Sequence, residues 1–341
     1  MRLLTYTFRT SALLAGAAAM MALAGCAKHE TTTTSATGGA EKPHIVFIFK
    51  VMGIPYADSL QKGVDRANKE LGVQAELKGP VTGNDIRGQV NLIEDQIARK
   101  VDAIVISAND ADSVKPAMKK AMEKGIKVYT WDADSPGSNR IFYVAGCDDV
   151  QIGRDVASHL AKDINGKGKV AIMTGTLTAN NLMMHVQGAR EEFKKYPAIT
   201  VVDPLLANND QKDQAISRTT EILQAHPDLA GMAGVCSPAA PGAAEALTQT
   251  GKAGKVKVWG ISLPSEVRDS IKKGIVNGAI LWNPADLTYA TAMLVRDNVK
   301  SGALPKSGQN IPGVGKLTVK GKQVTIPGAI ITKSNVDSFN F

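Results

Sequence analysis

The sequence predicts an α/β protein of two doubly wound parallel sheets joined by a three-stranded hinge. One observation is a series of short, β-branched apolar runs, typical of strands buried on both faces of a parallel sheet. A second is that helical patterns separate most of these runs. A third is that the alternation pauses repeatedly, which predicts a chain that passes back and forth between two lobes.

The predicted strands begin with residues 44–50, which read His-Ile-Val-Phe-Ile-Phe-Lys. The others are residues 103–107, 127–130, 141–145, 170–174, 229–235, 256–261 and 276–281. Helical patterns cover residues 56–71, 86–99, 112–124, 149–164, 181–195, 211–225, 239–250 and 285–301. Residues 307–341 read as turns and short strands, with a β-hairpin around residues 320–322.

The pauses set the predicted lobe boundaries. They fall around residues 132–143, 262–266 and 281–287. We therefore expect an N-terminal lobe of residues 43–140 plus 264–284, and a C-terminal lobe of residues 141–263 plus 285–341. In doubly wound sheets, ligands bind beyond the carboxyl ends of the strands. The strand ends are therefore where a site is expected.

The first 25 residues are predicted to be a signal peptide. Arg2 and Arg9 precede an apolar run at residues 12–23, which is too short to cross a bilayer as a helix. The run ends in Leu23-Ala24-Gly25-Cys26, which resembles the lipobox of bacterial lipoproteins and predicts a lipid on Cys26. The alternative is a buried cysteine after an ordinary signal peptide. Residues 26–42 are poor in apolar side chains and predict a flexible tether. The expected location is extracytoplasmic and membrane-anchored, in a periplasm or on the outer cell face.

Composition excludes some classes of protein. Hydrophobic residues make up 44% and charged residues 21%, which are globular values. The net charge of +8 becomes 8 − 2 = +6 once Arg2 and Arg9 leave with the signal peptide. Lysines are spread along the chain beside acids, and no basic block carries interleaved aromatics, so nucleic-acid binding is not expected.

Enzyme motifs are missing from the sequence. It contains no Gly-x-Ser-x-Gly, no phosphate-binding loop and no His-Glu-x-x-His, and we predict that His159, His185 and His226 are surface residues. Cys147 and Cys236 match no metal motif and are expected to be buried free thiols, with a bridge between them as the alternative. We expect no catalytic residues, no cofactor and no metal.

Polar and aromatic residues follow the predicted strands. Lys50 ends the first strand, and the residues beyond later strands include Asn109, Trp131, Asp132, Asp134, Asn180, Ser237, Ser262 and Trp282. Carboxylate and amide groups hydrogen-bond the paired hydroxyls of a polyol, a cation suits its oxygen-rich edge, and an aromatic ring covers its C–H face. The pattern predicts a site for a sugar-like ligand.

Several of these positions have an alternative interpretation as helix caps. We assign Asp110, Asp112 and Ser265 to capping, because short polar side chains satisfy the first amides of a helix. Lys50 and Asp132 are assigned to ligand binding, because a charge at the end of a buried strand is costly unless it is used.

From about Ile45 onward the chain resembles the periplasmic sugar-binding components of ATP-driven importers, of the ribose-binding, type I kind. The markers include Ile54-Pro55-Tyr56, Val101-Asp102-Ala103-Ile104-Val105-Ile106-Ser107, Gly125-Ile126-Lys127-Val128 and Ala225-His226-Pro227-Asp228. Within that group it is most similar to autoinducer-2-binding and rhamnose-binding lipoproteins. The motifs that carry this likeness include Phe49-Lys50, Thr130-Trp131-Asp132-Ala133-Asp134 and Ile311-Pro312-Gly313-Val314-Gly315-Lys316.

The resemblance implies ligand contacts from Lys50 and Asp132. Asn180 matches the amide of an acid–amide pair whose acid is absent here, which weakens the case for autoinducer-2 itself. Ser237 occupies a later contact of the subgroup. Tyr56 matches a stacking aromatic of the ribose-type proteins, with a core role as the alternative.

Other positions depart from the ribose-type proteins. Ala133, Ser262 and Trp282 stand where those proteins carry arginine, aspartate and glutamine, which disfavours ribose.

The expected function is that of a monomeric substrate-binding lipoprotein of a carbohydrate importer. It would close its lobes over a sugar or sugar-like molecule and deliver it to the permease. The first alternative is a sensing subunit that presents autoinducer-2 or a sugar to a membrane receptor. A second is a repressor core, which would need a DNA-binding helix-turn-helix before Pro43, where the signal and tether are predicted instead.

Overall fold

The computed structural model describes residues 42–341. The predicted signal peptide, the predicted lipidation at Cys26 and nearly all of the predicted tether lie outside the described residues. Within the described part, no helix is both long and apolar enough to cross a membrane.

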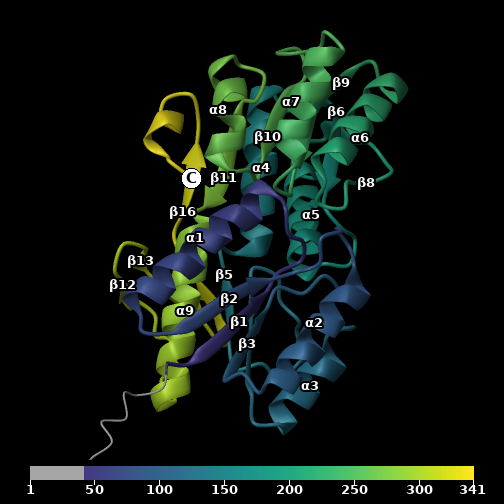
Figure 1. Ribbon diagram of the computed structural model, residues 1–341. Coiled ribbons are helices and arrows are strands. Elements are labelled where there is room, and N and C mark those ends of the chain that lie inside the picture. The colour runs from purple at the N-terminus through teal and green to yellow at the C-terminus, as the bar shows by residue number, and fades with distance from the viewer. Residues whose placement is uncertain (1–41) are drawn as a thin grey trace, which may run out of the picture. The chain divides into compact units, whose positions relative to one another are not determined.

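Two large sheets organise residues 42–341 (Figure 1). The first has the order β14-β15-β5-β4-β3-β1-β2, with strands β1 (His44–Ile48), β2 (Gln74–Lys78), β3 (Ala103–Ile106), β4 (Lys127–Trp131), β5 (Tyr143–Ala145), β14 (Thr318–Lys320) and β15 (Gln323–Thr325). The second has the order β16-β11-β10-β9-β6-β7, with strands β6 (Lys167–Thr174), β7 (Ala198–Val201), β9 (Leu229–Gly234), β10 (Lys257–Gly260), β11 (Gly278–Trp282) and β16 (Gly328–Ile331). The short β8 (Leu206–Ala207) pairs with β6, and β12 (Asn310–Ile311) pairs with β13 (Gly315–Lys316).

Both sheets have the same winding. The parallel strands run 2-1-3-4-5 in chain order within each sheet, which is a doubly wound order with its switch point between the first and third strands. The predicted fold class is therefore confirmed. We call the first sheet with its helices lobe 1, and the second lobe 2.

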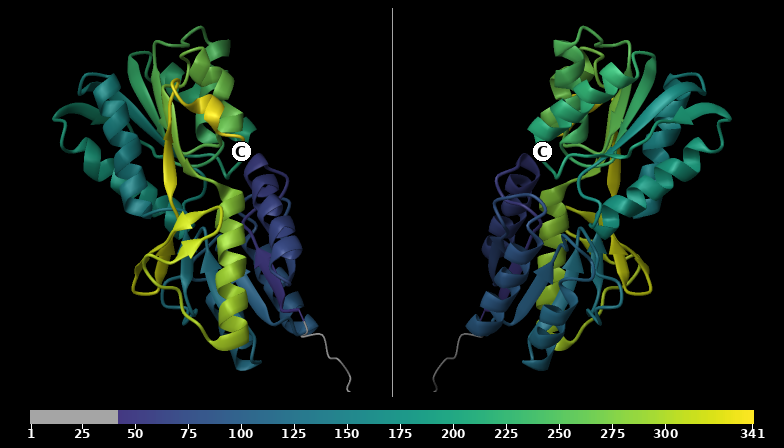
Figure 2. Two further views of the ribbon diagram at one scale, coloured as in Figure 1. Left: turned by 90° about the vertical axis from the view of Figure 1, so that its left-hand side faces the viewer. Right: turned by 90° about the vertical axis from the view of Figure 1, so that its right-hand side faces the viewer.

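Helices cover both faces of each sheet (Figure 2). In lobe 1, α1 (Pro55–Glu70) and α9 (Pro284–Ser301) pack together on one face, opposite α2 (Ile86–Arg99) and α3 (Lys115–Glu123). In lobe 2, α4 (Asp149–Asp163) and α5 (Asn180–Phe193) form one layer, opposite α6 (Lys212–Ala225), α7 (Ala239–Gln249) and α8 (Pro264–Lys272). A one-turn 3-10 helix, η1 (Val336–Ser338), lies beside α8.

Strand β1 shows why these residues make a doubly covered sheet. Its side chains alternate between faces, so Ile45 and Phe47 join the core that includes α1, whereas Val46 and Ile48 join a second core formed with α2 and α3. All four side chains are fully buried. The unbroken apolar run in the sequence is thus explained by burial on both faces.

The chain passes between the sheets three times, from β5 to α4, from β11 to α9 and from β15 to β16. The predicted lobe boundaries differ from this arrangement. Residues 264–284 belong to lobe 2, because β11 pairs in parallel with β10 and α8 packs against α7 and β11. Helix α9 instead packs on α1, where a Cβ at Gly63 would lie 2.3 Å from the Ala285 carbonyl oxygen. Residues 318–325 also return to the first sheet.

The predictions of single elements were more accurate than the predicted lobe boundaries. The hairpin around residues 320–322 is confirmed, with Lys320 paired to Gln323 and Gly321 at a φ of 59°. Strands β2, β7 and β8 and helix α8 were not predicted. Strand β2 is largely polar, β7 and β8 are short, and α8 begins within an expected pause.

Candidate ligand site

Lys50 and Asp132 form a buried ion pair at the carboxyl ends of β1 and β4. Lys50 Nζ lies 3.2 Å from Asp132 Oδ2, and the two side chains are 6% and 4% exposed. Burial lowers the pKa of Lys50, but the negative charges of Asp132 and Asp210 outweigh it and leave the pKa above its ordinary value. Lys50 therefore stays charged beside its carboxylates.

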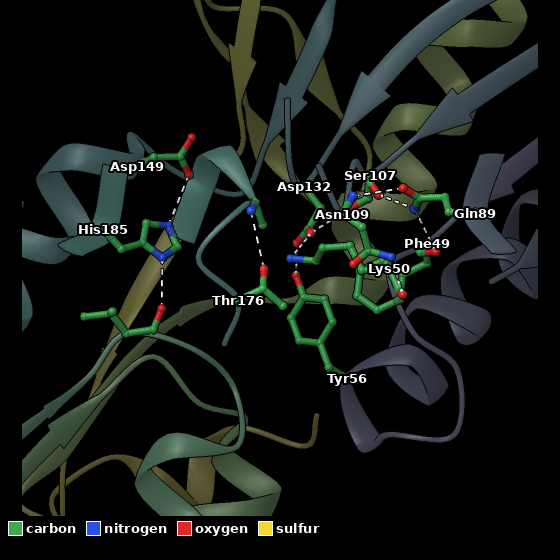
Figure 3. A network of polar contacts seen from close by, with 12 residues as sticks. Phe49, Lys50, Tyr56, Gln89, Ser107, Asn109, Asp132, Asp149, Thr176 and His185 are labelled. Atoms are coloured by element: carbon green, nitrogen blue, oxygen red, sulfur yellow. Dashed lines mark hydrogen bonds and ion pairs between the residues drawn. The ribbon is translucent and has the colours of Figure 1, made fainter. Parts of the chain in front are cut away.

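Asp132 is the centre of a hydrogen-bond network (Figure 3). Its Oδ2 accepts from Ser107 Oγ at 2.7 Å, and its Oδ1 accepts from the Tyr56 hydroxyl at 3.0 Å. The Tyr56 oxygen in turn accepts from Trp282 Nε1 at 2.9 Å. Burial and the nearby Asp132 raise the pKa of Tyr56 well above its usual value, so the hydroxyl remains a donor. Asp132 itself has a φ of 57°, in the left-handed region, which turns the chain sharply after β4.

Two buried amides brace the ends of β1 and β3. Gln89 Nε2 donates to the carbonyls of Phe49 and Ser107, at 3.2 and 2.8 Å, while its Oε1 accepts from the Asn109 backbone N–H at 2.8 Å. Asn109 Nδ2 donates to the Lys50 carbonyl at 2.9 Å. These bonds satisfy polar groups beside the switch point of the first sheet and hold Lys50 in place.

Lobe 2 supplies a second carboxylate and an amide. Asp210, after β8, is buried, and its pKa is raised by burial, with Lys50 opposing the shift and Asp132 adding to it. Asn181, in the first turn of α5, has a buried Oδ1 without a hydrogen-bond partner. One lysine thus faces two carboxylates, and an unpaired carbonyl oxygen lies nearby.

These groups surround a pocket between the ends of the two sheets. About 440 Å³ of space lies between the lining atoms, counting the part open to solvent. The lining is mostly apolar with a few polar groups, as is usual for small-molecule sites, and comprises Phe49, Lys50, Val51, Ile54, Tyr56, Asp132, Asn181, Leu182, His185, Asp210, Val235, Cys236, Ser237, Ile261, Leu281 and Trp282.

The two lobes also touch beside the pocket. Thr178 Oγ1 of lobe 2 donates to the Asn109 carbonyl of lobe 1 at 2.8 Å. A Cβ at Gly83 would lie 2.1 Å from the Asn209 carbonyl oxygen, so these backbones are in close contact. Contacts from both lobes therefore hold the two sides of the pocket together.

The structure brings together half of the residues predicted for the site. Lys50, Tyr56, Asp132, Ser237 and Trp282 line the pocket. Asn109 and Ser262 lie behind it, where Ser262 Oγ donates to the Ser237 carbonyl at 3.1 Å.

Three predicted residues point elsewhere. Trp131 is fully buried against Phe47 in the core. Asp134 is held by a bidentate contact with Arg140. Asn180 Nδ2 lies 3.3 Å from Met184 Sδ, and the neighbouring Asn181 is the amide that reaches the pocket.

Other lining residues were missed in the sequence. Asp210 follows β8, a strand of only two residues, so no apolar run marked its position. His185 was predicted to be a surface residue, and this was wrong: its side chain is 2% exposed. Its place on the buried face of α5, beside Leu182 and Ala189, was the available signal. Cys147 and Cys236 are free thiols, and Cys147 is only partly buried.

Comparisons with known proteins agree with this geometry. Residues 45–303 match the family model described as a periplasmic binding protein domain. The D-allose-binding periplasmic protein of Escherichia coli (strain K12) is 27% identical over 278 residues, which are 79% of this chain and 88% of that protein.

Two solved structures are similar along nearly their whole length. One is a solute-binding protein of an ABC transporter from Burkholderia graminis C4D1M in complex with D-arabinose, with 30% identity, a TM-score of 0.77 and coverage of 89% of this chain and 99% of that one. The other is LsrB from Clostridium saccharobutylicum in complex with AI-2, with 25% identity, a TM-score of 0.78 and coverage of 87% and 100%.

Proposed function

Because the chain belongs to the periplasmic binding protein domain family, we propose that it is the substrate-binding component of a carbohydrate ABC importer. It binds a sugar or sugar-like molecule between its lobes and delivers it to the permease. The observation that carries this proposal is the buried Lys50–Asp132 pair, which lies with Tyr56 and Trp282 in a pocket lined by both lobes.

The pocket has the chemistry that a polyol requires. Asp132 and Asp210 provide carboxylates for pairs of hydroxyl groups, and Lys50 provides a donor for ring or carbonyl oxygens. Tyr56 and Trp282 offer aromatic surface for C–H groups. Contacts to both lobes favour the closed arrangement, because a ligand shifts an equilibrium only through contacts that differ between the two states.

Family membership also supports a binding protein rather than an enzyme, and a place outside the cytoplasm. We propose further that a lipid on Cys26 anchors the chain to a membrane and that the chain acts as a monomer. Cys26→Ala, expressed in a bacterial host, should move the protein from the membrane fraction to the soluble fraction. Retention in the membrane fraction would argue against the lipid.

A ligand screen tests the proposed function. The protein is heated with pentoses, deoxyhexoses, hexoses and autoinducer-2, one at a time. A true ligand at about 100 times its Kd stabilises the folded state by about 2.7 kcal/mol and raises the melting temperature by several degrees. If none of these compounds shifts the melting temperature, the proposed substrate class is wrong.

A sensing role remains the second candidate, supported by the similarity to an AI-2-bound protein. A shift by autoinducer-2 alone in the same screen would favour it over sugar import.

A further inference from the structure

Three potential metal ligands meet near the crossing from β5 to α4. Cys147 lies in the loop after β5, Asp149 is the first residue of α4, and His185 lies on α5. Their ligand atoms all lie within 4.8 Å of one another. Asp149 and His185 are almost fully buried, and Cys147 is partly exposed. The cluster adjoins the Lys50–Asp132 pocket, because His185 lines it, but none of its three side chains bonds Lys50 or the Asp132 carboxylate.

Both ring nitrogens of His185 face hydrogen-bond acceptors. Its Nδ1 lies 3.1 Å from the Val235 carbonyl oxygen, and its Nε2 lies 3.2 Å from Asp149 Oδ1 (Figure 3). Both partners are acceptors, whereas a neutral imidazole has only one N–H. Because the carbonyl can only accept, Nδ1 carries the proton. Nε2 then faces a carboxylate with its lone pair unless a second positive species lies between them.

We propose that a divalent cation of borderline softness, such as Zn²⁺, binds to His185 Nε2, Asp149 Oδ1 and Cys147 Sγ. Zinc takes this mixture of nitrogen, oxygen and sulfur ligands. With metal–ligand bonds of about 2.0 to 2.1 Å, two ligands at a tetrahedral angle are about 3.3 Å apart. The 3.2 Å between Nε2 and Oδ1 fits that spacing.

The surroundings match those of a metal site. A metal-bound histidine typically donates its other ring N–H to a backbone carbonyl, as His185 does to Val235. The second carboxylate oxygen of Asp149, Oδ2, accepts from the Tyr143 hydroxyl at 3.1 Å, which orients the carboxylate. Both contacts leave Nε2 and Oδ1 available to the cation.

The local charge and access also favour a cation. The Asp149 carboxylate lies within 4.8 Å of the Cys147 thiol, and Asp148 and Asp155 line the same recess as Cys147. On the surface, the Lys320 side chain pairs with Asp148, with its Nζ 3.8 Å from Asp148 Oδ2. A recess lined by Cys147 and Asp148 gives access from solvent. A metal ion bound there would link the β5–α4 segment, where the chain crosses between the lobes, to helix α5.

Cobalt(II) provides the test, because a cobalt–thiolate bond gives a charge-transfer absorption that a carboxylate or imidazole does not. The full chain carrying Cys26→Ala, which removes a third thiol, is stripped with a chelator and titrated with Co²⁺. We expect the absorption to saturate at one equivalent and to disappear when Zn²⁺ is added. Absence of the absorption overturns the proposal, and the contact between His185 and Asp149 is then a direct one with no cation between them.

Variants identify the ligands. Cys147→Ser, a nearly isosteric change at a partly exposed position, should abolish the thiolate absorption. His185→Gln should abolish saturable binding, with circular dichroism to confirm folding. The matched control is Cys236→Ser, which removes the other described thiol and should keep the absorption. If the absorption survives in Cys147→Ser, the assignment is wrong even if His185→Gln fails to fold.

Discussion

Thr178 Oγ1 of lobe 2 donates a hydrogen bond to the Asn109 carbonyl of lobe 1, 2.8 Å away. Asn109 also holds the Lys50 carbonyl through its side chain, at 2.9 Å. The contact between the lobes and the charged end of the pocket therefore share one residue, so closure and ligand binding are expected to be coupled.

Thr178→Val should speed ligand release. It removes one interlobe hydrogen bond, worth about 0.5 to 1.5 kcal/mol, so dissociation should become about 2 to 10 times faster. Stopped-flow fluorescence measures this rate. The control is Thr200→Val on exposed β7, which should leave the rate unchanged. Equal rates in the wild type and Thr178→Val would mean that the bond does not hold the closed form.

Lys50→Ala and Asp132→Ala should each weaken binding of the identified ligand by about 1 to 3 kcal/mol, because each removes a charged hydrogen bond. Each also leaves the partner charge buried without its neighbour at 3.2 Å, so the melting temperature should fall as well. Calorimetric titration at a temperature where both variants are folded separates the two effects. Unchanged affinity in both variants would exclude this pair from the binding site.

Tyr56→Phe should reduce affinity by about 1 kcal/mol, roughly fivefold. The change removes the hydroxyl that links Trp282 to Asp132, while the ring stays in place. Tyr129→Phe is the matched control. The Tyr129 hydroxyl donates to Asn298 Oδ1, and neither Tyr129 nor Asn298 lines the pocket. Calorimetry should show lower affinity only for Tyr56→Phe. A similar loss in both variants would point to a general loss of stability instead.

Glu266 should make stability depend on pH. Burial raises its pKa to about 7, against an ordinary value of 4.5, with Lys212 and Ser237 opposing the shift. The folded state therefore binds this proton more tightly than the unfolded state does. Its contribution, on the order of 3 kcal/mol, is present below pH 4.5 and is lost as the pH rises through about 7.

Urea unfolding between pH 4.5 and 8 measures this effect. Glu266→Gln should flatten the decline in the free energy of unfolding over that range. Glu245→Gln on α7, a half-exposed carboxylate that pairs with Lys212, is the control and should retain the decline. If the wild type and Glu266→Gln lose stability in parallel, another group carries the effect.

The sequence was sufficient to predict the charged end of the pocket, because Lys50 and Asp132 each directly follow a run that reads as a buried strand. It was not sufficient for Asp210, which follows a strand of only two residues. Asn181 and Asn180 could not be told apart either, because the rotation of α5 decides which amide faces the pocket.

The lobe boundaries depended on information that no local pattern contains. Strand β11 reads like any other strand, and only its pairing with β10 places it in the second sheet. Helix α9 returns to lobe 1 because it fits against α1 at Gly63, a contact between residues far apart in the sequence.

The three crossings between the sheets restrict how the lobes can separate. A single flexible linker would let the second half of the pocket diffuse through a large volume, whereas three short connections limit the lobes mainly to bending about the crossings. If Lys50 and Asp132 bind the ligand as proposed, the groups on lobe 2 would meet that ligand at a high effective concentration. A molecule with few functional groups can then be retained, since little orientational entropy is left to lose when the lobes close.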